Sequence, residues 1–147
     1  MQDLIDFMDP VSVDELTEDT GVTDGQMAKH ISIYETDMPD VDDADIVFVG
    51  VPEMRGSGFF KSGGPSAPDM IRKHLYQLHY WHTDVKIADI GNVKMGETLH
   101  DSYAALKLVV TELTDMGKMV VIIGGSHDLT LSQYYALADH KDLIDAV

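Results

Sequence analysis

A histidine follows directly after a strongly apolar segment near the carboxyl end of the chain. Met119–Ile123 is a continuous apolar run, which is typical of a strand buried on both faces of a parallel sheet. Residues 124–125 are both glycine, and because glycine adopts positive φ readily, they permit a sharp turn. The polar triplet 126–128, Ser-His-Asp, then lies just beyond the carboxyl end of the strand, where open α/β sheets bind ligands. A neutral imidazole at His127 is a candidate transition-metal ligand, and a merely hydrogen-bonded histidine is the alternative.

Other chemistries fit the sequence less well. Neighbours in the chain cannot adopt the relay geometry of a hydrolytic triad, which excludes 126–128 in that role. Residues 58–62, Gly-Phe-Phe-Lys-Ser, lack the glycine that a P-loop needs before its lysine, and 56–61 fails the dinucleotide fingerprint at its last position. His79 and His82 lie beside aromatic residues, which favours packing or surface placement over metal binding.

Two charged residues follow the first predicted strand. Glu53 and Arg55 lie in the loop after residues 45–50, on the side of the sheet where ligands bind. They are able to line a pocket, and they are equally able to form an ion pair within the loop. The sequence leaves both interpretations open.

Alternating strands and helices must position these residues. The predicted strands are 45–50, 86–90, 119–123 and 143–147, and the predicted helices begin near 66, 97 and 131. This order indicates parallel βαβ units wound right-handed, and therefore an α/β fold with a parallel sheet flanked by helices.

Local signals define two of the helices. Ser66 is a good N-cap, with Asp69 three residues later and Pro68 in the first turn. The apolar face expected for this helix consists of Ile71, Leu75, Leu78 and His82. The stripe expected for the helix 97–116 consists of Leu99, Tyr103, Leu106, Val110 and Leu113, and Gly117 is its stop.

Residues 1–44 form an acidic lead-in to the α/β domain 45–147. A short amphipathic helix is possible before Pro10, made by Leu4, Ile5, Phe7 and Met8. We expect this lead-in to be largely solvated and to pack at an edge of the domain or at a subunit contact.

Composition excludes several classes of protein. Twenty-six acidic residues against ten basic ones give a net charge of −16, which argues against nucleic acid or an anionic membrane as a partner. No apolar run approaches the roughly 20 residues that span a bilayer. The chain has no cysteine, so it has neither disulfides nor thiolate metal sites, which fits a cytoplasmic protein.

Four ordered segments of the chain resemble the ureohydrolase family of arginases, agmatinases and formimidoylglutamases. They are 49–57, Gly64–Arg72, Ile87–Asn92 and the Gly-Gly-x-His turn at 124–127. The long acidic lead-in and the Ser-His-Asp variant are most similar to a bacterial formimidoylglutamase-like branch. The resemblance implies an arginase-like three-layer α/β/α fold, of which this chain would be the truncated N-terminal part.

The resemblance also implies a function. Its members use two Mn²⁺ ions to hydrolyse a linear amidine or guanidine such as arginine, agmatine or formimidoylglutamate, and His127 would be one metal ligand. The other ligands, beginning with an Asp-x-His-x-Asp cluster, would lie beyond Val147. We therefore expect no catalytic residue in this chain, no activity of the chain alone, and a homo-oligomeric parent.

Departures from the family pattern leave alternatives open. Ser126 stands in place of the usual aspartate and Asp128 in place of serine, while Asn92 stands where aspartate is frequent. Asp128 either supports the metal shell or caps the following helix, and the cap is the favoured prediction. The exchange leaves a non-catalytic ureohydrolase-fold protein, acting in assembly or regulation, as the alternative function. A nucleotide-binding module is disfavoured by the failed glycine spacings.

Overall fold

The computed structural model describes residues 4–17, 21–58 and 66–138. The strand predicted at 143–147 lies outside these residues, as do positions 59–62 of the rejected P-loop segment.

A mixed, mainly parallel sheet forms the centre of the described structure. Its strands are β1 (Met8–Asp9), β2 (Ser32–Ile33), β3 (Ile46–Gly50), β4 (Ile87–Val93) and β5 (Met119–Ile123). The order is β1-β4-β3-β5, and β2 also pairs with β4. The pairs β2–β4, β3–β4 and β3–β5 are parallel, whereas β1–β4 is antiparallel. The predicted α/β fold is confirmed.

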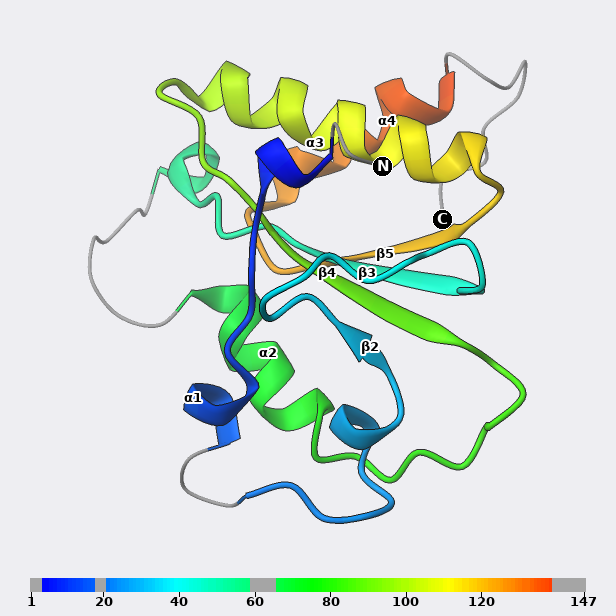
Figure 1. The fold of residues 1–147 in the computed structure, drawn as a ribbon. Helices are drawn as coiled ribbons and strands as arrows, with labels where there is room; N and C mark the ends of the chain where they lie inside the picture. Colours follow the sequence, from blue (N-terminus) through cyan, green and yellow to red (C-terminus); the bar gives the residue numbers. More distant parts are fainter. Residues whose placement is uncertain (1–3, 18–20, 59–65, 139–147) are drawn as a thin grey trace.

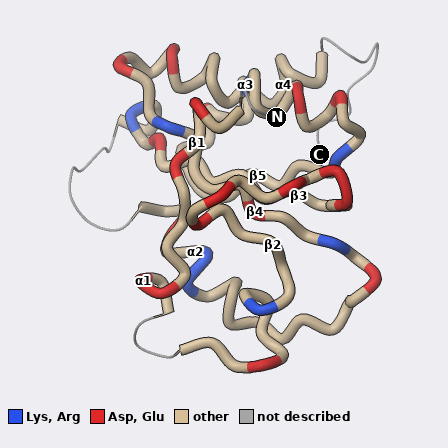
Figure 2. Tube along the Cα trace, viewed as in Figure 1, with Lys and Arg blue, Asp and Glu red and all other residues tan. Residues whose placement is uncertain are grey.

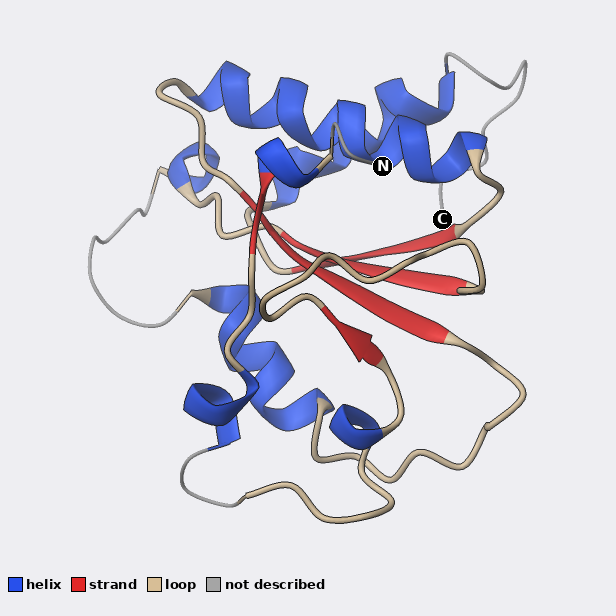
Figure 3. Cartoon of the chain, in the orientation of Figure 1, coloured by secondary structure: helices blue, strands red, loops and turns tan. Residues whose placement is uncertain are grey.

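Helices cover both faces of the sheet. The α-helices are α1 (Val13–Thr17), α2 (Ala67–Leu75), α3 (Leu99–Asp115) and α4 (Thr130–Ala138). Short 3₁₀ helices are η1 (Ile5–Phe7), η2 (Met27–Lys29), η3 (Arg55–Ser57) and η4 (His127–Leu129). Figure 1 shows α3 and α4 above the sheet and α1 and α2 below it, and the same three layers are seen in Figure 3.

The apolar stripe of α3 packs on the sheet as predicted. Leu106, Val110 and Leu113 are at most 1% exposed, and they belong to the main core cluster. Burial of such side chains contributes about 1.5–3 kcal/mol each. The N-cap of the helix is Thr98, whose side chain forms a reciprocal capping box with Asp101, and Gly117 follows the end of the helix with a φ of 73°.

Helix α2 begins as predicted but buries a different face. The Ser66 side chain accepts the Asp69 N–H, which confirms the N-cap. The helix ends at Leu75, and Ile71 and Leu78 are 44% and 56% exposed, so the predicted apolar face is wrong. Arg72 and Tyr76 face the sheet instead, both fully buried, because polar groups on β4 satisfy them there.

The acidic lead-in packs against an edge of the sheet. Where one amphipathic helix was predicted, the chain forms η1 and then β1, with Leu4 and Met8 1% exposed. Met8 pairs with Val93 at the end of β4. Packing at an edge is thus confirmed, while the α-helix is wrong because Met8 extends to pair with β4. A largely solvated lead-in is also wrong, because Tyr34 and Val41 are buried in the main core.

Strand β5 is less buried than its sequence predicted. Met119 and Val121 are 63% and 38% exposed. Burial on both faces is therefore wrong for the described structure, because β5 lies at its edge and pairs only with β3.

Charged residues are spread over the whole trace. Figure 2 shows Asp and Glu at many separate places and the fewer Lys and Arg scattered among them. Among the described helices, none is long and apolar enough to cross a bilayer.

Candidate functional site

The turn after β5 has a backbone that only glycine tolerates well. Gly124 and Gly125 have φ values of 81° and 83°. A Cβ on Gly124 would collide with the ring of Pro68, and one on Gly125 would collide with the Leu129 side chain. The predicted turn is therefore confirmed, and it ends β5 sharply at the edge where the carboxyl ends of the parallel strands lie.

His127 begins η4 immediately after this turn, and its side chain is exposed. It borders a shallow cavity of about 230 Å³, lined also by the Gly124–Ser126 turn, Thr130 and Gln133. No hydrogen bond or ion pair joins its imidazole to another residue in the described ranges. The imidazole is thus available to a ligand.

The two residues that flank His127 are both tied down. The Ser126 N–H donates to the main-chain oxygen of Glu53 at 3.0 Å, and Ser126 Oγ lies 3.4 Å from the same oxygen. The Asp128 carboxylate accepts a hydrogen bond from the Tyr103 hydroxyl. A Cβ on Gly56 would collide with that carboxylate, so the η3 backbone also lies against Asp128.

Asp128 does not have the cap role that the sequence favoured. It lies inside η4, whereas α4 begins only at Thr130, and its side chain is directed to α3. Burial would raise the pKa of Asp128, but hydrogen bonds including that from Tyr103 hold the pKa below its ordinary value. The same hydrogen bond raises the pKa of Tyr103 to about 12.

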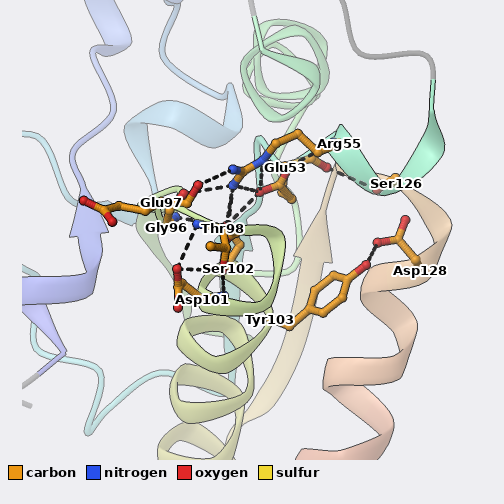
Figure 4. A network of polar contacts seen from close by, with 10 residues as sticks. All are labelled: Glu53, Arg55, Gly96, Glu97, Thr98, Asp101, Ser102, Tyr103, Ser126 and Asp128. Atoms are coloured by element: carbon orange, nitrogen blue, oxygen red, sulfur yellow. Dashed lines mark hydrogen bonds and ion pairs between the residues drawn. The ribbon is translucent and has the colours of Figure 1, made fainter.

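Glu53 and Arg55 form an ion pair, which confirms one of the two interpretations left open by the sequence. Arg55 Nη2 lies 2.5 Å from Glu53 Oε2, and Arg55 Nε lies 2.9 Å from Glu53 Oε1. Ser102 Oγ on α3 donates to Glu53 Oε2 at 2.7 Å. Figure 4 shows how these side chains link η3 to the start of α3.

The charge of Glu53 is strongly stabilised, although the residue is 0% exposed. Burial raises the pKa of its carboxyl, but hydrogen bonds from Arg55 and Ser102 outweigh burial and lower the pKa to about 2. Glu53 is therefore a carboxylate throughout the neutral range.

A second buried network lies under the sheet and involves the middle and the end of β4. Arg72 donates to both Asp89 oxygens, at 2.8 and 2.7 Å, and to Asn92 Oδ1 at 2.5 Å. Tyr76 donates its hydroxyl hydrogen to Asp89 at 2.9 Å, and Asn92 Nδ2 donates to Asp69 at 3.2 Å. Asn92 is thus a partner of both Arg72 and Asp69.

His127 has no companion ligands in the part of the chain that the structure describes. No group of three or more His, Cys, Asp or Glu residues there is arranged to hold a metal ion. His79 and His82 are exposed on the loop after α2, and the His82 ring lies tilted by 34° against that of Trp81, with ring centroids 4.2 Å apart.

Comparison with known proteins places the fold and the turn in one family. The sequence profile of the arginase family matches residues 44–146, which is more than half of the chain. The chain belongs to the arginase family. The predicted ureohydrolase resemblance is confirmed.

Two curated relatives carry the same name, formimidoylglutamase. A formimidoylglutamase of Hahella chejuensis is 30% identical over 101 residues, covering 67% of this chain and 31% of that protein. A formimidoylglutamase of Nocardia farcinica is 29% identical over 125 residues, covering 81% of this chain and 40% of that protein. The chain therefore spans less than half of the length of these curated relatives, and its likeness to the formimidoylglutamase branch is confirmed.

Solved structures share the fold. An arginase superfamily protein from Trypanosoma cruzi superposes with a TM-score of 0.64 at 21% identity, covering 81% of this chain and 41% of that one. T. cruzi formiminoglutamase with Mn²⁺ superposes with a TM-score of 0.63 at 22% identity, covering 80% and 41%. The arginase-like α/β architecture predicted for the chain is confirmed.

Sequence reasoning found the turn but missed most of its supports. Ser102 and Tyr103 were not singled out as partners of the site, and Arg72 was not predicted to be buried. One signal was present, because Pro68, Arg72 and Tyr76 recur at spacings of four on α2. The polar partners on β4 and η3 are distant in sequence, so no local pattern could reveal them.

Proposed function

We propose that this chain is the N-terminal part of a manganese-dependent hydrolase that cleaves a C–N bond of a linear amidine. Residues 1–44 are its lead-in, and 45–147 begin its arginase-like domain. The observation that carries the proposal is the exposed imidazole of His127, which has no hydrogen-bond partner among the described residues. A glycine turn presents it at the carboxyl end of β5 in an arginase-family chain.

The chemistry of His127 fits manganese. A neutral imidazole is a suitable ligand for transition metals, and the cavity beside it is open to solvent. T. cruzi formiminoglutamase, which shares the fold, has been crystallised with Mn²⁺. When bound, Mn²⁺ supplies an acidified water and stabilises the charge that develops on the substrate.

The chain supplies only part of such a site. His127 would hold one ion, and the carboxylates and further histidines would come from sequence beyond Val147, starting with an Asp-x-His-x-Asp cluster. The 147-residue chain alone would then be inactive, because one imidazole does not complete a shell of four to six ligands.

Two relatives are named formimidoylglutamase, which supports formimidoylglutamate as the substrate over arginine or agmatine. The carboxyl-end edge of the sheet, where His127 lies, is the side on which α/β proteins of this kind bind small molecules. The parent is proposed to be a cytoplasmic homo-oligomer with a small-molecule substrate and without nucleic-acid or membrane partners.

The experiment starts from the coding sequence after codon 147 and continues with the full-length protein. Hydrolysis of formimidoylglutamate, agmatine and arginine is assayed with Mn²⁺ and after chelation. We expect Mn²⁺-dependent activity on one of them, and a loss of at least about 100-fold in His127→Ala. His82→Ala, which removes another exposed histidine, is the matched control and should keep full activity. Absence of the downstream ligands, or of activity on every amidine, would favour the non-catalytic alternative.

A further inference from the structure

Three segments far apart in the sequence meet beside His127. They are η3 with the preceding Glu53, the first turn of α3 with Ser102 and Tyr103, and the turn 124–128. Figure 4 shows the first two segments joined through Arg55. The third segment is joined to them by the hydrogen bonds of Ser126 to Glu53 and of Asp128 to Tyr103.

Arg55 attaches the η3 segment to the start of α3. Its Nη1 donates to the Glu97 carbonyl at 2.9 Å and its Nη2 to the Gly96 carbonyl at 2.9 Å. It also reaches Ser102 Oγ at 3.1 Å. Because the planar guanidinium offers several donors in a fixed geometry, one side chain fixes the carboxylate and the backbone before α3 together.

Glu53 connects the residues at the start of α3 with the turn 124–128. Its side chain is held by Arg55 and Ser102, and its carboxylate Oε1 accepts the Arg55 N–H at 2.9 Å. Its main-chain oxygen accepts the Ser126 N–H at 3.0 Å, one residue before His127. The side chain of Glu53 is therefore fixed on α3 while its backbone holds the turn.

The opposite side of His127 is held from the same two elements. Tyr103, which follows Ser102 on α3, donates to the Asp128 carboxylate. Gly56, which follows Arg55 in η3, approaches that carboxylate so closely that a Cβ would not fit. Hydrogen bonds to both neighbours therefore hold the backbone of His127 from two sides.

We propose that Glu53 and Arg55 are positioning residues for His127, and that they hold the Ser126–Asp128 turn so that the imidazole meets its metal ion. This inference rests on the proposed function. In this role neither side chain would contact the metal or the substrate, and both would act through the backbone of the turn.

The make-up of the pair supports a role in geometry rather than in stability alone. Glu53 is fully buried, whereas the Arg55 side chain is 27% exposed, and charged partners taken out of water are often replaced by apolar residues without loss of stability. An apolar pair could not form the hydrogen bonds between the Arg55 guanidinium and the Glu53 carboxylate. These directional bonds set the position of residue 53 relative to α3.

Local hydrogen exchange in the 147-residue chain tests this without any metal. The first variant, Arg55→Lys, keeps the positive charge but loses the several N–H donors of the guanidinium. The second, Glu53→Gln, keeps the size of the side chain but loses its negative charge. We expect the Ser126 amide to exchange at least about tenfold faster in both, and its rate to increase by a larger factor than the rates of the core amides of Val109 and Val110, which report global stability. Tyr76→Phe is the matched control, because it removes a buried hydrogen bond to Asp89 and leaves the turn alone.

Manganese affinity of the full-length protein is the second measurement. Arg55→Lys should raise the Kd for Mn²⁺ about 10- to 100-fold, as loss of a ligand-orienting partner does, and Tyr76→Phe should leave it unchanged. If Arg55→Lys folds with unchanged Ser126 exchange, or binds Mn²⁺ as tightly as the wild type, the positioning role is overturned. If the wild-type protein binds no Mn²⁺, the proposed function fails, and the role of Glu53 and Arg55 in fixing the turn is still decided by exchange.

Discussion

Arg72 and Asp89 form a bidentate ion pair in which both side chains are 0% exposed. The guanidinium comes from α2 and the carboxylate from the middle of β4, so the pair joins the lower helical layer to the sheet. The Arg72 guanidinium also donates hydrogen bonds to Asn92 Oδ1 and to the Gly91 carbonyl. Helix α2 is thus attached to the sheet by a buried ion pair, whereas α3 is attached by an apolar stripe.

Removing one member of this pair should destabilise the chain strongly. Arg72→Leu leaves the Asp89 carboxylate buried without its counter-ion, and we expect the free energy of unfolding in urea to fall by about 3–5 kcal/mol. Tyr76→Phe, which removes only one hydrogen bond to Asp89, should cost about 1 kcal/mol. Equal losses in the two variants would contradict this account of α2.

The low pKa of Glu53 predicts how stability depends on pH. Folding lowers the pKa of this carboxyl from its ordinary 4.5 to about 2. Its contribution is therefore complete above pH 4.5 and is lost as the pH falls toward 2. In urea unfolding across this window, Glu53→Gln should show a shallower loss of stability than the wild type. Since other acids titrate in both proteins, the difference between the two curves isolates Glu53, and parallel curves would refute the assignment.

Glycine at position 124 is required for two separable reasons. Gly124→Ala places a methyl group at a φ of 81° and against Pro68, whereas Gly117→Ala meets a similar φ of 73° with nothing within 4 Å. We expect Gly117→Ala to cost about 1 kcal/mol through backbone strain and Gly124→Ala to cost clearly more. Thermal or urea unfolding of both variants measures the difference, and equal costs would show that Pro68 moves freely.

The exposed face of α2 should tolerate polar substitution. Ile71 is 44% exposed, so Ile71→Ser should change the free energy of unfolding by no more than about 0.5 kcal/mol in this chain. Leu106→Ala in the core should cost about 2–5 kcal/mol by comparison. A large loss in Ile71→Ser would restore the apolar face that the sequence predicted for this helix.

The parts of the structure that the sequence predicted correctly depend on local signals. The glycines at 124–125 demanded a turn, Ser66 had the type and place of an N-cap, and the stripe on α3 repeated at helical spacing. Each of these follows from residues within a few positions of one another, where side-chain chemistry and backbone geometry determine the outcome.

What the sequence did not predict depends on distant partners. The buried face of α2 was missed because Arg72 is buried only when Asp89, 17 residues later, neutralises it. The antiparallel pairing of β1 joins Met8 to Val93, which no periodicity records. Asp128 was expected to cap a helix, but a tyrosine 25 residues earlier binds its carboxylate instead.

The manganese content of the full-length protein tests the central claim most directly. Protein purified after expression with Mn²⁺ is measured by elemental analysis, beside His127→Ala. The account predicts about two ions per subunit in the wild type, as two-metal hydrolases hold, and fewer in the variant. A folded full-length protein that retains no manganese, or a His127→Ala variant that retains as much as the wild type, would contradict it.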